Sequence, residues 1–273
     1  MAVIALTSAR GAPGVSTTAL AMALTWPRPT LLLEADAAGS SSYLAGYLQG
    51  AVTHDAGLVD LAMAQRDNDI LGGIHRSSIA LPPDGHTRLI PGLTSPVQAR
   101  TMSSVWEQIA GVLHSLDQHG TDVFIDAGRL GTIFGPQPLL RSADAVLLVT
   151  RSNLPAIAAI RAAAPVLRDD LLNGGRGDDV LSLLVVGQGQ PYSAKDISDA
   201  VGIPTVATID FDPVGAEVLT YGSKTPRRFQ QSPFVRSIAA ANSALGVQLR
   251  DRAARLRTTT LRAPQQPTEP RRV

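Results

Sequence analysis

Cysteine is absent from the 273 residues of this chain, and its absence excludes disulfide bonds, thiolate catalysis and cysteine-ligated zinc. Long apolar runs are absent as well, since none approaches the ~20 residues that a membrane-spanning helix requires. The N-terminal segment also lacks the basic region of a signal peptide. We therefore expect a cytoplasmic protein.

The chain has little net charge and few aromatic residues. A formal charge of +1 provides no global field that would draw the protein to nucleic acid or anionic lipid. Aromatic residues make up 4% of the sequence and hydrophobic residues 44%, which indicates a core packed mainly from Ala, Val and Leu. The only lysines among the 24 basic residues are Lys195 and Lys224. The length suits one large α/β domain or two small ones.

Apolar strand-like runs alternate with helical patterns along the chain, which predicts a mainly parallel sheet with helices on both faces. The expected strands are residues 3–7, 30–33, 88–90, 122–125, 145–150, 180–186 and 205–209. The expected helices are residues 16–26, 42–48, 57–65, 97–119, 154–172, 194–201, 213–221 and 233–257. We therefore predict a single doubly wound α/β domain over residues 1–257, followed by a disordered Pro- and Arg-rich tail at 258–273.

A glycine-rich segment, residues 8–18, joins the first expected strand to the first expected helix. A strand, a glycine loop and a helix in this order form a phosphate-binding loop, in which backbone N–H groups and the helix N-terminus face the phosphates. Gly11 and Gly14 stand where the backbone must approach closely, and Ser16 stands where a ligand for Mg²⁺ is expected. Val15 occupies the position of the lysine that would contact the β- and γ-phosphates.

Two aspartates follow expected strands at the edge of the sheet where this loop lies. Asp36 comes shortly after the strand at 30–33, and Asp126 directly follows the strand at 122–125. Ligands of open α/β sheets bind at the carboxyl ends of the strands, where a carboxylate can orient a water molecule or hold Mg²⁺ through its water shell. Each aspartate taken alone is as readily explained as a helix cap or a turn residue. Together with the loop, the two predict a phosphate and metal site.

These residues give the chain a resemblance to the ParA/MinD group of deviant-Walker P-loop ATPases, which covers most of residues 1–245. The loop of that family begins with a signature lysine, where this chain has Arg10, and continues to the Walker lysine, where it has Val15. Ser16 and Thr17 stand at the positions of the two threonines that follow. Other segments of the chain also resemble the family. They correspond to its two switches, a later strand and the loops beside the base, and they are residues 33–36, 122–127, 140–150, 212–213 and 220–224.

The resemblance implies a P-loop NTPase-like fold that binds ATP and Mg²⁺ at this edge of the sheet. The residues that it assigns to the nucleotide are Gly11, Gly14, Val15, Ser16, Thr17 and Asp126. Those that it assigns to the metal are Ser16, Asp36 and Asp126. It also implies that Asp36 positions the hydrolytic water and that Arg10 reaches the phosphates of a partner subunit, so a homodimer is expected.

The chain departs from the family pattern at the nucleotide itself. Val15 removes a charge-assisted bond to phosphate that is worth about 1.5–3 kcal/mol. It also removes a transition-state charge neutralisation that is worth roughly 10²–10³ in rate. Arg10 is a candidate to compensate, and the alternative is that it is only a solvated loop charge. The other departures are Ala9 and Ala12 in place of glycines, Pro13 within the loop, and Gly187 in place of an asparagine that helps to recognise adenine.

We therefore expect a nucleotide-switch protein with weakened ATP binding and slow or absent hydrolysis. It would act in subcellular positioning, with a protein partner in a pilus, secretion or partition apparatus. The alternatives are an active ATPase for plasmid or chromosome partition and a nucleotide-free interaction scaffold. The basic helix at 233–257 is a candidate for nonspecific docking to DNA or a membrane, which would place the protein at the nucleoid or the membrane surface. The alternative for this helix, whose apolar face is thin, is a solvated surface.

Overall fold

The computed structural model describes residues 2–82, 85–175 and 177–262. Within these residues, eight strands form one sheet in the order β3-β4-β2-β5-β1-β6-β7-β8. Neighbouring strands run parallel, except that β3 is antiparallel to β4 at one edge. The predicted mainly parallel α/β sheet is confirmed. The strands are β1 (Val3–Ser8), β2 (Thr30–Glu34), β3 (Ile79–Ala80), β4 (Thr87–Ile90), β5 (Asp122–Arg129), β6 (Ala145–Arg151), β7 (Leu181–Val186) and β8 (Thr205–Ile209).

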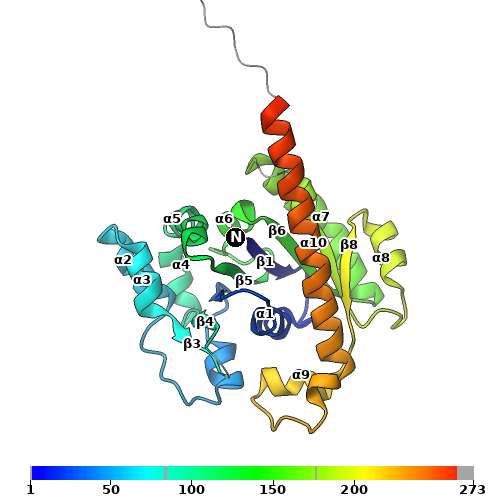
Figure 1. Ribbon diagram of the computed structural model, residues 1–273, viewed down its shortest axis with the longest axis horizontal. Coiled ribbons are helices and arrows are strands. Elements are labelled where there is room, and N and C mark those ends of the chain that lie inside the picture. Colours follow the sequence, from blue (N-terminus) through cyan, green and yellow to red (C-terminus); the bar gives the residue numbers. More distant parts are fainter. Residues whose placement is uncertain (1, 83–84, 176, 263–273) are drawn as a thin grey trace, which may run out of the picture.

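Helices cover both faces of the sheet, as the prediction of a doubly wound fold requires (Figure 1). One face packs against a group of helices that includes α2 (Leu58–Arg66), α3 (Ile70–Ser77), α4 (Ala99–Met102), α5 (Trp106–Leu113), α6 (Gln137–Ser142), α7 (Leu154–Asn173) and α8 (Ala194–Val201). The other face packs against α1 (Val15–Leu24), the π-helix η1 (Tyr43–Tyr47), α9 (Pro213–Thr220) and α10 (Pro233–Arg262). Short 3₁₀ segments are η2 (Pro96–Gln98), η3 (His114–His119), η4 (Asp178–Val180) and η5 (Phe229–Gln231).

The central strands are buried along their whole length. Every residue of β1, β2 and β7 is buried, which is typical of parallel strands with helices on both sides. In the sheet, β5 lies between β2 and β1, and its Asp126 is in register with Glu34 on one side and Leu6 on the other. The segments that follow β1, β2 and β5 therefore meet at one edge of the sheet, because parallel strands end at the same edge.

The helix predicted at 97–119 is interrupted. It is divided into α4, α5 and η3, and the break after α4 falls at two serines. The Ser103 hydroxyl donates to the carbonyl of Arg100, and the Ser104 hydroxyl donates to the carbonyl of Thr101. Such bonds compete with helix propagation. Helix α3 and strand β3 were not predicted, because short elements give weak periodic patterns.

Helix α10 crosses the outside of α1 and extends beyond the body of the molecule (Figure 1). It ends at Arg262, whereas the sequence predicted its end near residue 257. Residues 263–273 of the predicted tail lie outside the described residues. Of the three leucines on the apolar face of this helix, Leu245 is fully buried and Leu249 packs against the core, whereas Leu256 is half exposed.

Candidate functional site

The segment between β1 and α1 forms a tight loop that depends on two glycines. Gly11 has φ +71° and Gly14 has φ +99°, a region of backbone conformation that favours glycine. Gly14 is the N-cap of α1, and the carbonyl oxygen of Gly14 accepts a hydrogen bond from the Thr18 N–H at 2.8 Å. The free N–H groups of the first turn of α1 therefore face the loop, which is an arrangement that binds anions.

The loop supplies no buried cation. Val15 is 7% exposed and packs into the hydrophobic core of the α1 face, so its side chain presents no polar atom to the loop. Pro13 is buried, whereas Arg10 is exposed at the rim of the loop. Thr17, further along α1, shares a hydrogen bond of 2.9 Å with the hydroxyl of Thr220 at the end of α9.

Ser16 and Asp126 are brought together at the carboxyl end of β5, and a tyrosine lies between them. The Tyr43 hydroxyl donates to Asp126 Oδ2 at 2.8 Å and lies 3.1 Å from the carbonyl oxygen of Ser16. The Ser16 side chain also hydrogen-bonds to Asp126, and the Gly128 N–H donates to Asp126 Oδ1 at 3.1 Å. Asp126 and Tyr43 are 0% and 2% exposed. All these groups therefore form one closed network under the loop.

Burial controls the titration of this network. Burial raises the pKa of Asp126, although hydrogen bonds from Ser16, Tyr43 and Gly128 oppose the shift. Burial also raises the pKa of Tyr43 well above its usual range, and the neighbouring Asp126 and Glu34 carboxylates add to this. The Tyr43 hydroxyl is therefore a neutral donor over the whole physiological range.

Asp36 lies beside the network, in the segment after β2. Its Oδ1 accepts the N–H of Ala38 at 2.9 Å, which is the local turn that the sequence allowed as an alternative role. Its carboxylate also lies directly against Gly128, where a Cβ would be 2.2 Å from Asp36 Cγ. The charge of Asp36 contributes to the raised pKa of Asp126. The structure thus brings Ser16, Asp36 and Asp126 to one place.

Glu34 holds the segment that carries Tyr43, a role that was not predicted from the sequence. The Glu34 side chain is buried and accepts hydrogen bonds from the Ser41 hydroxyl, from the Ser42 N–H at 2.9 Å and from the Gly92 N–H at 2.9 Å. Burial raises the pKa of Glu34 to about 7, against the opposing effect of these bonds. Because Ser41 and Ser42 directly precede Tyr43, Glu34 fixes the start of η1.

A small cavity of about 170 Å³ adjoins the loop on its other side. Its walls include the loop residues Pro13, Gly14 and Thr17, together with Arg151 at the end of β6 and Phe211 after β8. The Arg151 guanidinium stacks over the Phe211 ring at 3.7 Å from the ring centroid, and partial burial lowers the pKa of Arg151. Arg151 is a cation beside the loop that sequence analysis missed, because it lies more than a hundred residues from the loop in the chain.

Of the segments that resemble the base-flanking loops, Asp212 lines this cavity, and Gly187 lies against Phe211 of its wall. Gly187 has φ +72°, and a Cβ there would be 3.0 Å from the Cβ of Phe211. Asp212 lines the cavity and caps α9, where its Oδ1 accepts the N–H of Gly215 at 2.9 Å. An asparagine at position 187 would therefore be strained by the positive φ and crowded by Phe211. Phe211 occupies the space beside Gly187 on this side of the cavity.

The residues present fit a phosphate group better than they fit a metal. Backbone N–H groups of the loop and of the α1 N-terminus suit phosphate oxygens. Ser16, Asp36 and Asp126 supply the oxygen ligands that Mg²⁺ prefers. Both carboxylate oxygens of Asp126, however, already accept hydrogen bonds from Tyr43 and Gly128. A metal could use Asp126 only if the Tyr43 hydroxyl withdrew.

Comparisons with known proteins bear on the fold of the chain. No family model matches the chain. Two uncharacterized proteins from two strains of Mycobacterium tuberculosis are 32% identical to it over an alignment of 149 residues that covers 49% of this chain. The chain spans only 38% of the length of these relatives in that match.

Solved structures are similar over almost the whole chain. A ParA family ATPase from Chlorobium tepidum has a TM-score of 0.66 with 14% identity, covering 88% of this chain and 98% of that one. MinD from Pyrococcus horikoshii complexed with Mg-ADP has a TM-score of 0.65 with 16% identity, over 90% and 98%. The MinC:MinD complex from Aquifex aeolicus gives 0.63 with 17% identity, over 90% and 95%. The chain therefore has the single-domain P-loop fold of MinD and ParA ATPases.

Among the described residues, we find no helix with the length and apolar character needed to cross a bilayer.

Proposed function

We propose that this protein is a ParA/MinD-like nucleotide switch with weakened ATP binding and slow or absent hydrolysis. In this proposal, Gly11, Gly14, Val15, Ser16 and Thr17 surround the phosphates. The observation that carries the proposal is the network under the loop. Its buried carboxylate, Asp126, is already satisfied by the Tyr43 hydroxyl.

Two features weaken nucleotide binding independently. A valine at position 15 gives no charge-assisted bond to phosphate, a loss of about 1.5–3 kcal/mol. The metal would need Ser16, Asp36 and Asp126, and freeing Asp126 breaks its hydrogen bond to Tyr43, which costs a further ~1.5–3 kcal/mol because the acceptor is charged. Arg151 beside the loop offsets part of the first loss, since its guanidinium lies on the wall of the same cavity as Gly14 and Thr17.

The proposed roles of the remaining site residues follow the resemblance. Asp36 would position a water molecule, and its carboxylate lies at the surface of the network beside Gly128. Arg10 is exposed at the rim, a position from which a guanidinium can reach a second subunit. A symmetric homodimer would present two such contacts.

Positioning is the cellular role that we propose, with a protein of a pilus, secretion or partition apparatus as the partner. The solved relatives include a MinD bound to its partner MinC, which supports partnering of this kind. Docking through α10 to DNA or to a membrane is the weaker part of the proposal. Arg252 on this helix is buried and pairs with Asp179 at 3.1 Å, and Leu245 belongs to the core.

A nucleotide-free interaction scaffold is the second candidate function, and the same closed network favours it. An active partition ATPase is the third candidate, for which Arg10, Arg151 and the loop backbone would have to suffice. A Mg²⁺-dependent ATPase signal would favour the third candidate over the proposal.

Titration calorimetry with ATP and Mg²⁺ tests the proposal on three proteins: wild type, Val15→Lys and Val15→Met. Val15→Met is the matched control, because methionine supplies a long side chain without charge. We expect Val15→Lys to bind ATP about 10- to 100-fold more tightly than the other two, which corresponds to one charge-assisted hydrogen bond. Wild-type affinity in the low micromolar range or tighter, unchanged by Val15→Lys, would show that the missing lysine has no effect.

A further inference from the structure

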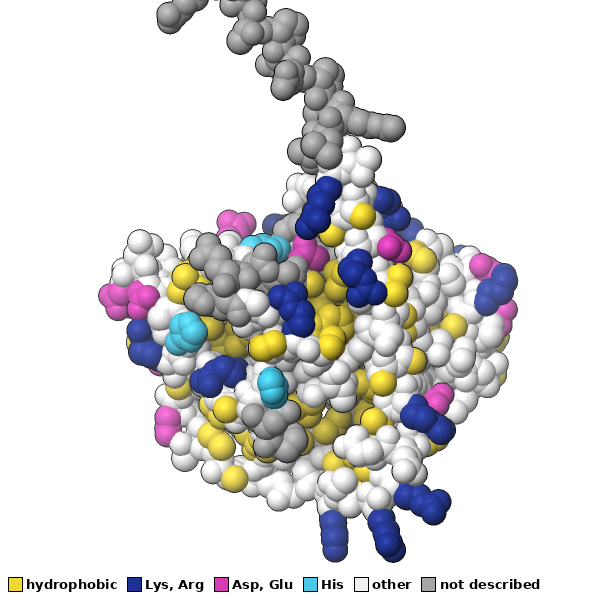
Figure 2. Space-filling model, in the orientation of Figure 1, with side chains coloured by type: hydrophobic (Ala, Val, Ile, Leu, Met, Phe, Trp, Pro, Cys, Tyr) yellow, Lys and Arg dark blue, Asp and Glu magenta, His cyan; other side chains and the backbone are white. Residues whose placement is uncertain are grey.

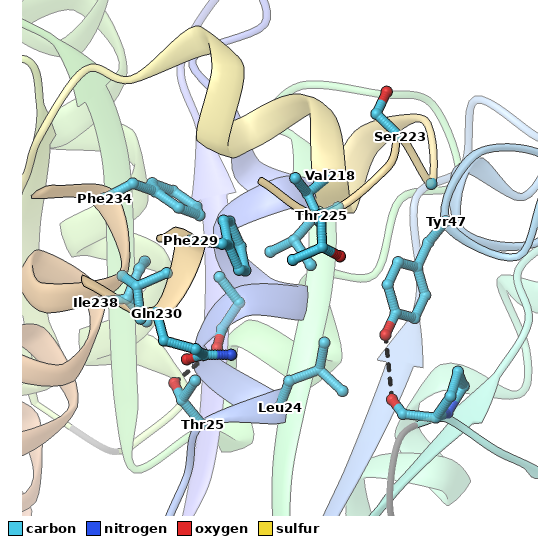
Figure 3. A pocket seen from close by; sticks show the side chains of 15 residues that line it. Leu24, Thr25, Tyr47, Val218, Ser223, Thr225, Phe229, Gln230, Phe234 and Ile238 are labelled. Atoms are coloured by element: carbon cyan, nitrogen blue, oxygen red, sulfur yellow. Dashed lines mark hydrogen bonds between the residues drawn. The ribbon is translucent and has the colours of Figure 1, made fainter. Parts of the chain in front are cut away.

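A second cavity, of about 500 Å³, lies away from the loop between α1, η1, α9 and the start of α10. Figure 3 shows that Val218, Phe229, Phe234 and Ile238 face into it from α9, η5 and α10, with Leu24 from α1 on the opposite wall. Its volume is within the range of small-molecule sites in proteins, roughly 300–1,000 Å³. The cavity is therefore large enough for an apolar ligand chain.

Two hydroxyls on its walls are engaged with backbone carbonyls. The Thr25 hydroxyl donates to the carbonyl of Ala21 at 2.7 Å, and the Tyr47 hydroxyl donates to the carbonyl of Pro82 at 3.1 Å (Figure 3). These hydroxyls have already used their donor hydrogens, so a ligand gains little by placing polar groups beside them. The interior favours hydrocarbon.

The loop that supplies part of the cavity wall is basic. Between Glu217 and Asp251 the chain has no acidic residue, yet it carries the basic residues Lys224, Arg227, Arg228, Arg236 and Arg250. Lys224 lies between the wall residues Ser223 and Thr225, and Arg228 directly precedes the wall residue Phe229.

The basic side chains of the α9–α10 loop are exposed, whereas the residues next to them in the chain line the cavity. Lys224, Arg227 and Arg228 are all exposed, and Figure 2 shows basic side chains projecting from the end of the molecule where the α9–α10 loop lies in Figure 1. Asp212 lines a neighbouring hollow with Arg228, but its Oδ1 is engaged by the Gly215 N–H. An apolar hollow with exposed cations on the same loop is complementary to an anionic amphiphile.

We propose that this cavity binds an acyl chain of an anionic phospholipid, whose headgroup phosphate is held by Lys224, Arg227 and Arg228. The occupant is a lipid of a bilayer surface, since each cation near an anionic surface adds to the attraction while the cavity accepts the chain. A nucleic acid would use the charges but would leave the apolar cavity empty. The residues that hold the lipid are separate from the loop.

The walls of this cavity are connected to the loop. Helix α9 supplies Val218 and Leu219 to the cavity, and the next residue, Thr220, shares its hydrogen bond with Thr17 of α1. The carbonyl oxygen of Thr220 also packs against Gly46 of η1, where a Cβ would be 2.0 Å from that oxygen. Occupation of the cavity would therefore act on elements that contact Thr17 and that carry Tyr43.

Co-sedimentation of the full chain with vesicles tests the proposal. The vesicles contain either phosphatidylcholine alone or phosphatidylcholine mixed equally with phosphatidylglycerol. One variant combines Arg227→Glu with Arg228→Glu, and its control combines Arg66→Glu with Arg161→Glu, which makes the same charge change at exposed positions on α2 and α7. Val218→Trp fills the cavity, and Thr225→Trp does so from an exposed loop position if the first variant does not fold.

We expect binding to the mixed vesicles only, weakened at least about tenfold by the loop charge reversal and by the filled cavity, and unchanged in the control. Binding that survives the tryptophan variants would overturn the proposal, because the cavity would then take no part. An equal loss of vesicle binding in the control variant would show that only overall charge matters, and it would also overturn the proposal. Absence of vesicle binding, with binding of duplex DNA that the loop reversal abolishes, would identify a nucleic-acid surface instead.

Discussion

Removal of one hydroxyl, in Tyr43→Phe, gives a pH-dependent loss of stability. The variant keeps the ring, which is 2% exposed, and deletes only the donor that lies 2.8 Å from Asp126 Oδ2. A hydrogen bond to a buried carboxylate is worth about 1.5–3 kcal/mol, and one to a neutral carboxylic acid about 0.5–1.5 kcal/mol. The loss therefore depends on whether Asp126 is ionised.

The sign follows from the raised pKa of Asp126. Because burial raises this pKa in the folded state, the contribution of Asp126 to stability is present at low pH and is lost as the pH rises through the folded-state pKa. The Tyr43 hydrogen bond lowers that pKa, so deleting the hydroxyl raises it further. The destabilisation caused by Tyr43→Phe should accordingly grow with pH, from about 0.5–1.5 kcal/mol where Asp126 is protonated to about 1.5–3 kcal/mol where it is ionised.

Urea unfolding at about pH 5 and about pH 8 measures this difference. Tryptophan fluorescence reports the transition, since Trp106 is fully buried and Trp26 packs edge-on against Phe124 at 5.2 Å. Tyr47→Phe is the matched control, because the Tyr47 hydroxyl bonds to an exposed carbonyl and its loss should stay within about 0.5 kcal/mol at either pH. A loss for Tyr43→Phe below about 0.5 kcal/mol at both pH values, or a loss that is larger at pH 5 than at pH 8, would refute the assignment of the Tyr43 hydroxyl to the Asp126 carboxyl group.

Two further predictions concern Glu34 and Arg10. Glu34 titrates at about 7 in the folded protein, above its usual value of 4.5, so its stabilising effect is greatest below pH 4.5 and declines as the pH rises to about 7. The stability difference between wild type and Glu34→Gln should therefore fall by up to about 3 kcal/mol over that window in urea titrations, and a pH-independent difference would contradict this. Arg10→Ala should weaken any dimer formed with ATP and Mg²⁺ at least about tenfold in light scattering, while the melting temperature of the monomer stays the same. A wild type that remains monomeric with nucleotide, or an Arg10→Ala variant that dimerises equally well, would leave Arg10 as a surface charge only.

The features that the sequence predicted are local ones. The apolar runs of β1, β2 and β5 are continuous in the chain, and parallel strands must end at one edge, so the meeting of the loop with Asp36 and Asp126 could be inferred. The structure brings Ser16, Asp36 and Asp126 together, while their roles toward nucleotide stay predictions.

The features that the sequence did not predict depend on distant contacts. Tyr43 is 83 residues from Asp126 in the chain, and nothing in the pattern around 42–48 distinguishes a tyrosine that enters the site from one that packs on the surface, such as Tyr47. Within the π-helix at Tyr43–Tyr47, Gly46 likewise approaches the carbonyl of Thr220, which is distant in the chain. Arg151 lies beside the loop only because β6 pairs with β1.

Unfolding in urea with and without Mg-ATP tests the central claim most directly, because a ligand that binds only the folded state stabilises it by RT ln(1 + [L]/Kd). At about 5 mM Mg-ATP, weakened binding predicts a gain of about 0.4–1.4 kcal/mol, which corresponds to ligand at roughly one to ten times Kd. A gain of about 4 kcal/mol requires ligand at roughly 1,000 times Kd and would contradict the account, since the loop would then bind tightly without its lysine. No gain at all would also contradict it and would leave the protein as a nucleotide-free scaffold.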